Sequence, residues 1–257
     1  LKERFLNNTD YPDDMFINGE TAKSLVDNNT MLVVVDCDRP SIIDEPDLLT
    51  MVKTIVVFDH HRQSSETIQG AVLSYCEPYA SSASELIAEM MQYIREGIKA
   101  KPIEADCMYG GIVIDTREFT NQTGVRTFEA AAYLRRCGAD IVRIRKIFRE
   151  DFSDYQAKAH AISAADIYRN AFALSSVERA GSESPTVLCA KAANELLNIR
   201  GIKASVVLTK VEDTVFLSAR SIDEVNVQVL MEKLGGGGHR TVAGAQDRRA
   251  SCRERVL

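Results

Sequence analysis

The sequence predicts an α/β fold, in which a parallel-sheet domain is followed by a smaller α/β domain. In the first half, short β-branched apolar runs alternate with longer helical patterns, which is typical of βαβ units. In the second half, the strand-like runs 203–211 and 214–221 flank Glu212 and Asp213, which predicts a β-hairpin beside the single helix expected near residues 184–199.

The first two predicted strands cover residues 31–36 (MLVVVD) and 54–59 (TIVVFD). Both are continuous apolar runs, as expected for strands covered on both faces, and both end in an aspartate. Residues 82–97 then predict a helix with Gly97 as its C-cap. The apolar stripe of this helix consists of Leu86, Ile87, Met90, Met91 and Ile94.

Residues 105–116 (ADCMYGGIVIDT) are expected to begin as helix or loop and to close in a third short strand carrying Asp115. A helix should start near Thr123 and stop at Gly138. Its inward side chains are predicted to be Phe128, Ala131, Ala132 and Leu134. An Ala-rich helix over residues 154–167 is expected to join two domains. We place the domains at 1–152 and 169–247, with a linker helix over 153–168 between them. The Arg-dense tail over 248–257 is expected to be non-native.

The composition of the chain limits the classes of function that are compatible with the sequence. A formal charge of -6 over 257 residues argues against a broad basic surface for long double-stranded nucleic acid, but it allows a small anionic substrate. The six cysteines lack C-x-x-C spacing, which disfavours a thiolate zinc site or a disulfide framework and fits a reducing cytoplasm. With no signal peptide and no bilayer-length apolar run, we expect no membrane contact within these residues.

Acidic and imidazole side chains gather at the predicted strand ends: Asp36, Asp59, His60, His61 and Asp115. In open α/β sheets, ligands bind beyond the carboxyl ends of the strands, so these groups should meet at one edge. Carboxylates mixed with imidazole suit a hard to borderline divalent ion such as manganese. A single strand-end aspartate is usually only a turn former or a helix cap, but the adjacent histidine pair favours a functional site. His160, on the Ala-rich helix, is interpreted as an ordinary surface or interface residue.

A second constellation is GGGGHRTVAGAQ, residues 235–246. Consecutive glycines indicate a backbone that approaches another group closely or presents N–H groups to an anion, and a flexible linker is the alternative. Arg220 and Ser221, after the predicted strand TVFLSA, are further candidates for phosphate contact.

The ordered set VVVDCDRP, VVFDHHRQ, GIVIDTREFTNQTG and GGGGHRTVAGAQ resembles motifs two to four of the DHH phosphoesterases, followed by the signature of their DHH-associated domain. Within that superfamily, EPYASSASEL and SARSIDEVNVQVLMEKLGGGGH are similar to cyclic di-AMP phosphodiesterases of the GdpP type. The resemblance implies a metal-dependent hydrolase that linearises cyclic di-AMP to pApA. It also implies that these residues are the cytoplasmic catalytic part of a membrane-anchored protein, and it leaves a homodimer open.

The resemblance also implies roles for individual residues. Asp36 would bridge two Mn²⁺ ions, and His60 and Asp115 would complete the shell of the second ion. His61 would lie close to the scissile phosphate, oriented with its neighbour by Asp59. Arg220, Ser221, His239 and the backbone of Gly236, Gly237 and Gly238 would hold the phosphates of a cyclic dinucleotide or short oligonucleotide. Relatives often read Asp-Thr-His at the second motif, whereas this chain has Asp36, Cys37 and Asp38, and we interpret Asp38 as a turn residue.

The first motif of the family, a histidine with two aspartates, has no counterpart before Asp36. Asp10, Asp13 and Asp14 surround Pro12 in a polar stretch and are interpreted as loop. We therefore expect the chain as given to lack most ligands of one metal, to be catalytically weak and to expose apolar surface. The alternatives are an exonuclease for short oligoribonucleotides, a RecJ-like nuclease, a pyrophosphatase, which should lack GGGGH, or a non-catalytic nucleotide-binding module.

Overall fold

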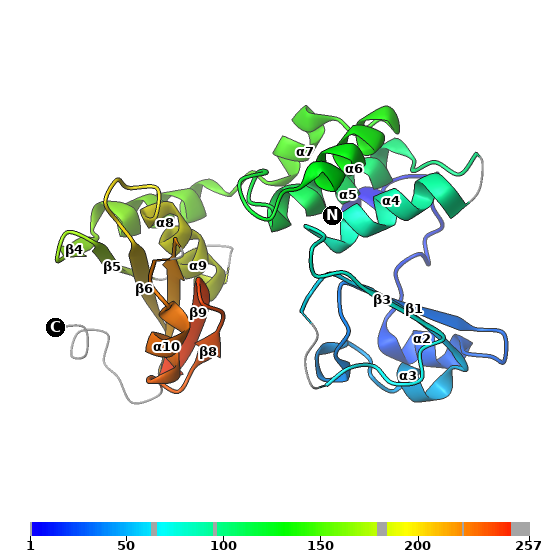
Figure 1. The fold of residues 1–257 in the computed structure, drawn as a ribbon, viewed down its shortest axis with the longest axis horizontal. Helices are drawn as coiled ribbons and strands as arrows, with labels where there is room; N and C mark the ends of the chain where they lie inside the picture. Colours follow the sequence, from blue (N-terminus) through cyan, green and yellow to red (C-terminus); the bar gives the residue numbers. More distant parts are fainter. Residues whose placement is uncertain (1, 63–65, 95–96, 179–183, 223, 248–257) are drawn as a thin grey trace. The chain divides into compact units, whose positions relative to one another are not determined.

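The computed structural model describes residues 2–62, 66–94, 97–178, 184–222 and 224–247. The tail that we predicted to be non-native lies outside the described residues. The chain divides into two compact units, residues 1–149 and 150–257 (Figure 1). Within the described part, no helix is both long enough and apolar enough to cross a bilayer.

The sheet of the first unit consists of three parallel strands in the order β1-β2-β3. Their bounds are β1 (Met31–Val35), β2 (Thr54–Asp59) and β3 (Leu73–Cys76). Parallel pairing aligns the carboxyl ends of the strands, so Asp36 and the Asp59-His60-His61 run lie at the same edge, as the sequence predicted.

One face of this sheet is covered and the other is open. Ile55 and Val57 pack in a core with Val26 and Leu49, residues next to or within the short helices α2 (Gly19–Leu25) and α3 (Leu48–Met51). On the opposite face of β1, among the described residues, Met31, Val33 and Val35 are 57%, 43% and 46% exposed. The prediction that both faces are covered is therefore wrong for β1, because an apolar run does not specify which segment supplies the second layer. The expected apolar exposure is confirmed.

A helical layer follows the sheet in sequence: α4 (Ala83–Ile94), α5 (Pro102–Asp115), α6 (Val125–Arg136) and α7 (Ile141–Ile147). Its core includes Ile112 and Leu134, both fully buried. The buried Asp106 carboxylate accepts two hydrogen bonds from Arg143 and one from the Asp140 backbone, which ties α5 to α7. The remaining short elements are α1 (Lys2–Leu6) and a 3₁₀ turn, Pro40–Ile42.

The predicted third strand near Asp115 does not exist, because α5 continues through this segment and ends at Asp115. The β-branched run Ile112 to Ile114 suggested a strand, but the two preceding glycines serve helix packing. A Cβ on Gly111 would lie 2.5 Å from Ser84 Oγ of α4. Helix α6 begins at Val125, and its predicted inward residues Phe128 and Ala132 are exposed, whereas Ala131 and Leu134 are buried.

The second unit is built on a six-stranded sheet in the order β4-β5-β6-β7-β9-β8. Strands β5 and β6 are parallel and the other neighbours are antiparallel. The bounds are α8 (Phe152–Ser163), β4 (Asp166–Tyr168), β5 (Phe172–Val177), α9 (Pro185–Leu196), β6 (Ala204–Val211), β7 (Thr214–Ser221), α10 (Val227–Glu232), β8 (Gly237–Gly238) and β9 (Val242–Asp247). The predicted hairpin of β6 and β7 is confirmed, with Glu212 at a positive φ of 53° in its turn.

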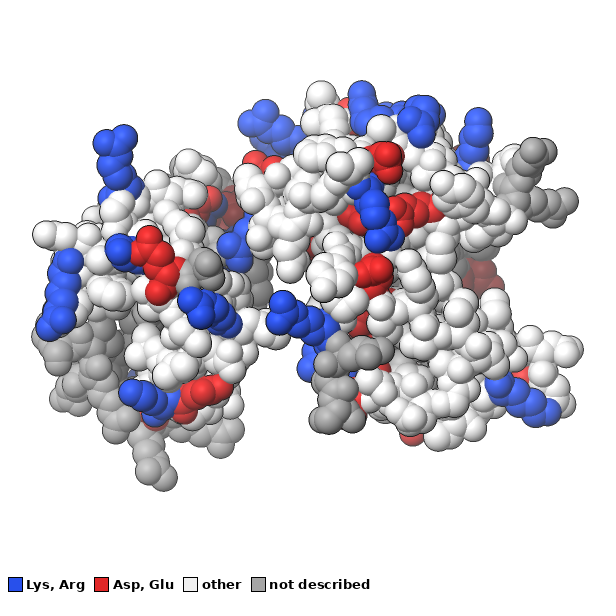
Figure 2. Space-filling view, in the orientation of Figure 1, with Lys and Arg blue, Asp and Glu red and all other residues white. Residues whose placement is uncertain are grey.

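Helices α8 and α9 share one core with β5 and β6, so the Ala-rich helix packs within the second unit. Helix α10 packs on the other face, where Val227 and Met231 contact Ala204, Ala219 and Ala243. His160 on α8 is exposed, which confirms its interpretation as a surface residue. On the face shown in Figure 2, basic and acidic side chains of the described residues are interspersed without a broad basic patch.

Candidate metal centre

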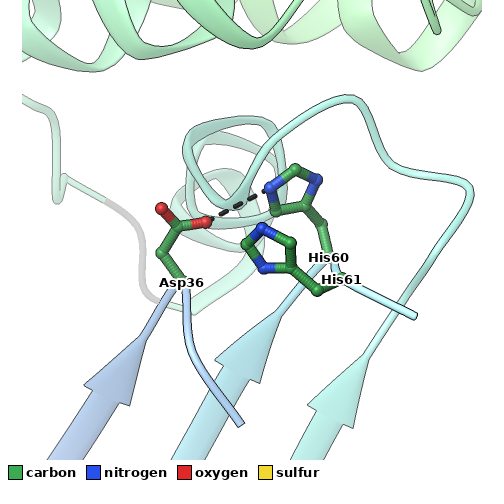
Figure 3. Close-up of side chains that lie close together, drawn as sticks. All are labelled: Asp36, His60 and His61. Carbon is green, nitrogen blue, oxygen red and sulfur yellow. Dashed lines mark ion pairs between the residues drawn. The ribbon is translucent and has the colours of Figure 1, made fainter. Parts of the chain in front are cut away.

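The carboxyl ends of β1 and β2 bring Asp36, His60 and His61 together (Figure 3). One potential ligand atom from each of the three side chains lies within 4.8 Å of the others. Asp36 Oδ1 is 3.2 Å from His60 Nε2. Asp36 has a positive φ of 66°, which for a non-glycine residue costs about 1 kcal/mol, and its N–H donates to Phe58 O at 2.8 Å. Backbone strain of this kind is typical of functional positions.

The side chain of Asp59 holds His60 and His61 in position. It is fully buried, and its Oδ1 accepts hydrogen bonds from the backbone N–H groups of His60 and His61 at 2.8 and 3.3 Å. The same oxygen lies 2.7 Å from His61 Nδ1. This contact holds the proton on Nδ1 in neutral His61 and leaves Nε2 as the free acceptor.

Asp115 reaches the same cluster from a helix. Its Oδ2 lies 3.9 Å from His60 Nε2, although it comes from the C-terminal end of α5 rather than from a strand. Beside it, a cavity of about 520 Å³ is lined by Asp36, Asp115, Ser84 and Gly111, among others. The three residues predicted as metal ligands, Asp36, His60 and Asp115, are thus neighbours in space.

Charge coupling within the cluster follows from these distances. The hydrogen bond to His60 lowers the pKa of Asp36, and the same contact raises the pKa of His60. Burial raises the pKa of Asp115, and the neighbouring His60 opposes that shift. A carboxylate pair around one imidazole presents oxygen and nitrogen donors without thiolate, a set that fits a hard to borderline divalent cation.

Asp38 is buried, which a role as a turn residue does not require. It lies in the loop after β1, as predicted, but it is only 3% exposed. Burial raises the pKa of its carboxyl, and the charge of Asp59 raises it further. Among the described residues, neither Asp38 Oδ2 nor Asp59 Oδ2 has a hydrogen-bond partner. Asp10, Asp13 and Asp14 lie in an exposed loop between α1 and α2, which confirms their interpretation.

The predicted phosphate-binding residues of the second unit lie on neighbouring strands. Arg220 on β7 pairs with Val242 on β9, and the N–H of His239 donates to Val242 O at 2.7 Å, so both residues flank one point of the sheet. His239 is exposed. Ser221, by contrast, is 3% exposed and donates its hydroxyl to Val225 O at 2.6 Å.

The glycine run is explained by the close approach of two backbones. A Cβ on Gly236 would lie 2.1 Å from Gly244 O, and one on Gly238, whose φ is 141°, would lie 2.5 Å from Val242 O. Gly237 has open space around it. The flexible-linker alternative is therefore wrong, since Gly237 and Gly238 form β8.

The turn that enters α4 has a role that the sequence pattern did not predict. Ser81 donates its hydroxyl to Glu85 Oε2 at 2.6 Å, and the N–H of Glu85 donates to Ser82 Oγ at 3.1 Å. This is a capping arrangement, and the spacing of Ser82 and Glu85 in SSASEL was the signal that could have revealed it. The turn places the first residues of α4 beside Asp36 and Asp115.

Two family domains match the chain in this order. Residues 3–112 match the N-terminal domain of the DHH family, and residues 172–257 match the DHHA1 domain. The chain therefore belongs to the DHH family and carries a DHHA1 domain in its second unit.

Curated relatives include the cyclic-di-AMP phosphodiesterase GdpP of Geobacillus thermodenitrificans, 46% identical over 90% of this chain and 35% of the relative. GdpP of Bacillus subtilis is 42% identical over 90% of this chain and 35% of its own length. PdeA of Listeria monocytogenes, also a cyclic-di-AMP phosphodiesterase, is 40% identical over 88% of this chain and 35% of its own length. The chain thus spans about a third of these relatives.

A crystal structure of an exopolyphosphatase-related protein from Bacteroides fragilis superposes with a TM-score of 0.80. It covers 96% of this chain and 75% of that chain, at 21% identity. This likeness confirms the predicted fold class, a parallel-sheet DHH domain followed by a smaller α/β domain.

Proposed function

We propose that this chain is the catalytic part of a metal-dependent phosphodiesterase that hydrolyses cyclic di-AMP to linear pApA. The observation that carries the proposal is the meeting of Asp36, His60 and Asp115 at the carboxyl edge of a DHH-family sheet. Three relatives, 40–46% identical over 88–90% of this chain, are named for the same substrate.

Asp36, His60 and Asp115 would hold one Mn²⁺ ion, because their two carboxylates and one imidazole suit manganese better than zinc. When bound, a divalent ion polarises the phosphate and activates water. Asp59 holds the proton of neutral His61 on Nδ1, so Nε2 is left free and would accept or return a proton at the scissile phosphate. Asp59 thereby acts through His61, as an orienting residue.

The described residues contain one compact carboxylate and imidazole group of this kind. This cluster offers no complete second ligand set among the described residues, and Asp36, with more than half of its side chain exposed, would be available as a ligand to a second ion. Two bound ions would stabilise both the attacking and the leaving oxygen, which a single ion would not do. We therefore expect residues 1–257 to hydrolyse cyclic di-AMP far more slowly than a version extended at its N-terminus, and equal rates would show that the first motif was misassigned.

Phosphates of the substrate would bind to Arg220 and His239 of the second unit, with the N–H groups near Gly237. Gly237 is the member of the glycine run that no neighbour crowds. Ser221 is left out of this proposal because its hydroxyl is already bonded to Val225.

The metal proposal is tested by Mn²⁺ binding, measured by electron paramagnetic resonance. His60→Ala and Asp115→Ala should each remove tight Mn²⁺ binding, whereas the matched control His160→Ala, on the exposed face of α8, should leave it unchanged. Retention of wild-type Mn²⁺ affinity in the His60→Ala, Asp115→Ala double variant rules out this site.

The substrate proposal is tested by calorimetry with cyclic di-AMP, linear pApA and a longer oligoadenylate in the presence of Mn²⁺. Cyclic di-AMP should bind most tightly. A preference for the linear forms would instead identify an exonuclease for short oligonucleotides.

A further inference from the structure

The turn between β3 and α4 begins at the candidate metal centre. Cys76, the last residue of β3, pairs with Asp59, and the N–H of Glu77 donates to Asp59 O at 2.9 Å. Tyr79 follows two residues later, so its Cα lies within about 7 Å of that of Glu77. The turn therefore begins beside Asp59, the residue that precedes His60 and His61 in the chain, and Tyr79 lies two residues beyond this point.

Hydrogen bonds to Glu77 hold the backbone of this turn at Tyr79 and Ala80. The N–H of Ala80 donates to Glu77 O at 3.0 Å, and the N–H of Tyr79 donates to Glu77 Oε1 at 3.2 Å. Glu77 Oε2 in turn lies 3.8 Å from Arg126 NH1 of α6. The turn is thus anchored to both the sheet and the helical layer.

Exposure falls sharply after Tyr79. Ala80, Ser81 and Ser82 are 1%, 0% and 0% exposed, whereas Tyr79 is 92% exposed. An aromatic ring on a turn that hydrogen bonds hold in place has little conformational entropy to lose when the ring is covered. This combination is typical of an aromatic anchor for a ligand.

We propose that Tyr79 is a base-stacking residue, which binds one nucleobase of the substrate while the metal centre binds the adjoining phosphate. The inference rests on the proposed function and adds to it a residue that contacts the base. Aromatic rings stack on every nucleobase, because each base has a π face, so Tyr79 contributes affinity without choosing between adenine and guanine.

The chain contains no tryptophan, which makes a direct optical test available. Tyr79→Trp places the single tryptophan of the chain in the turn, and stacking of adenine on it quenches its emission. Tyr93→Trp is the matched control, because Tyr93 is 86% exposed but lies toward the far end of α4, about 15 Å along the helix from Ala83. With Mn²⁺ present, cyclic di-AMP and AMP should quench Tyr79→Trp, inorganic phosphate should not, and Tyr93→Trp should respond to none of them.

Binding constants supply the second measurement. By calorimetry, Tyr79→Ala should weaken cyclic di-AMP binding by about five- to a hundredfold, Tyr79→Phe should bind like the wild type, and the affinity for inorganic phosphate should be unchanged in both.

The outcomes separate this inference from the proposed function. Tight cyclic di-AMP binding and hydrolysis, with no quenching of Tyr79→Trp and no loss in Tyr79→Ala, would overturn the stacking role and leave the function intact. Quenching by AMP, without preferential binding or hydrolysis of cyclic di-AMP, would support stacking and overturn the function. Failure of every nucleotide to bind the wild type would overturn both.

Discussion

Replacing Asp59 by asparagine should separate the chemistry of the site from its stability. In the wild type, Asp59 Oδ1 accepts two backbone N–H groups and faces His61 Nδ1 at 2.7 Å, while Asp59 Oδ2 is buried without a partner among the described residues. The side-chain oxygen of an asparagine would keep the hydrogen bonds from the two backbone N–H groups. Its NH₂ group would take the place of the unpartnered Oδ2. The pKa of Asp38 is raised mainly by burial and further by the charge of Asp59, and the change removes that charge.

The magnitudes follow from this arrangement. The free energy of unfolding of Asp59→Asn should stay within about 1 kcal/mol of the wild type, because the retained bonds and the relieved repulsion offset the lost charge. Asp59→Ala loses three hydrogen bonds and should be destabilised by about 2–4 kcal/mol. Mn²⁺ affinity or activity should nevertheless fall by about 10- to 100-fold in Asp59→Asn, since the histidine pair loses its anionic partner.

Urea denaturation of the metal-free protein and Mn²⁺ titration measure the two quantities independently. A stable Asp59→Asn protein with wild-type Mn²⁺ affinity and activity would refute the orienting role of Asp59. A strongly destabilised Asp59→Asn protein would refute the reasoning about its buried oxygen.

The remaining predictions concern pH, phosphate and the glycine run. The pKa of His60 is raised from 6.5 mainly by Asp36, so its contribution to metal-free stability is complete below pH 6.5 and is lost as the pH rises through the raised value. The pKa of Asp36 is lowered from 3.8, so its contribution is present above pH 3.8 and is lost as the pH falls through the lowered value. The Tm difference between the metal-free wild type and Asp36→Asn should therefore shrink above pH 6.5. The Mn²⁺ affinity should rise over the same range, because His60 deprotonates. A Tm difference that does not depend on pH would contradict the ion pair of Asp36 and His60. Arg220→Ala should weaken calorimetric binding of cyclic di-AMP about tenfold with unchanged Mn²⁺ content, and equal binding would exclude its phosphate role. Gly238→Ala should destabilise the protein by about 1–3 kcal/mol in urea denaturation, whereas Gly237→Ala, with open space around it, should not; similar values for both would contradict the close approach of β8 and β9.

The parts of the fold that sequence reasoning predicted correctly carry a strong local signal. The runs ending at Val35 and Asp59 are long enough and β-branched enough to be strands, and the acidic turn at Glu212 marks a hairpin. Helix α5 was partly missed, since Ile112, Val113 and Ile114 favour a strand locally while tertiary packing holds them in a helix. The glycines that weaken a helix in isolation here allow it to approach α4 closely.

The candidate site shows the same division. Asp36, His60 and His61 follow strands directly, so the alignment of parallel strands was enough to bring them together. Asp115 reached the correct place for the wrong reason, because its position depends on how α5 packs rather than on a strand end. The burial of Asp38 and the exposure of Tyr79 depend on neighbours distant in sequence and leave no periodic signal.

The most direct test of the central claim is Mn²⁺-dependent conversion of cyclic di-AMP to pApA, followed by chromatography, in a version of the protein extended at its N-terminus. The wild type should form pApA with Mn²⁺ and none after chelation, and the His60→Ala, Asp115→Ala double variant should form none in either condition. Full activity of that double variant without metal would contradict the assignment of Asp36, His60 and Asp115 as a metal centre.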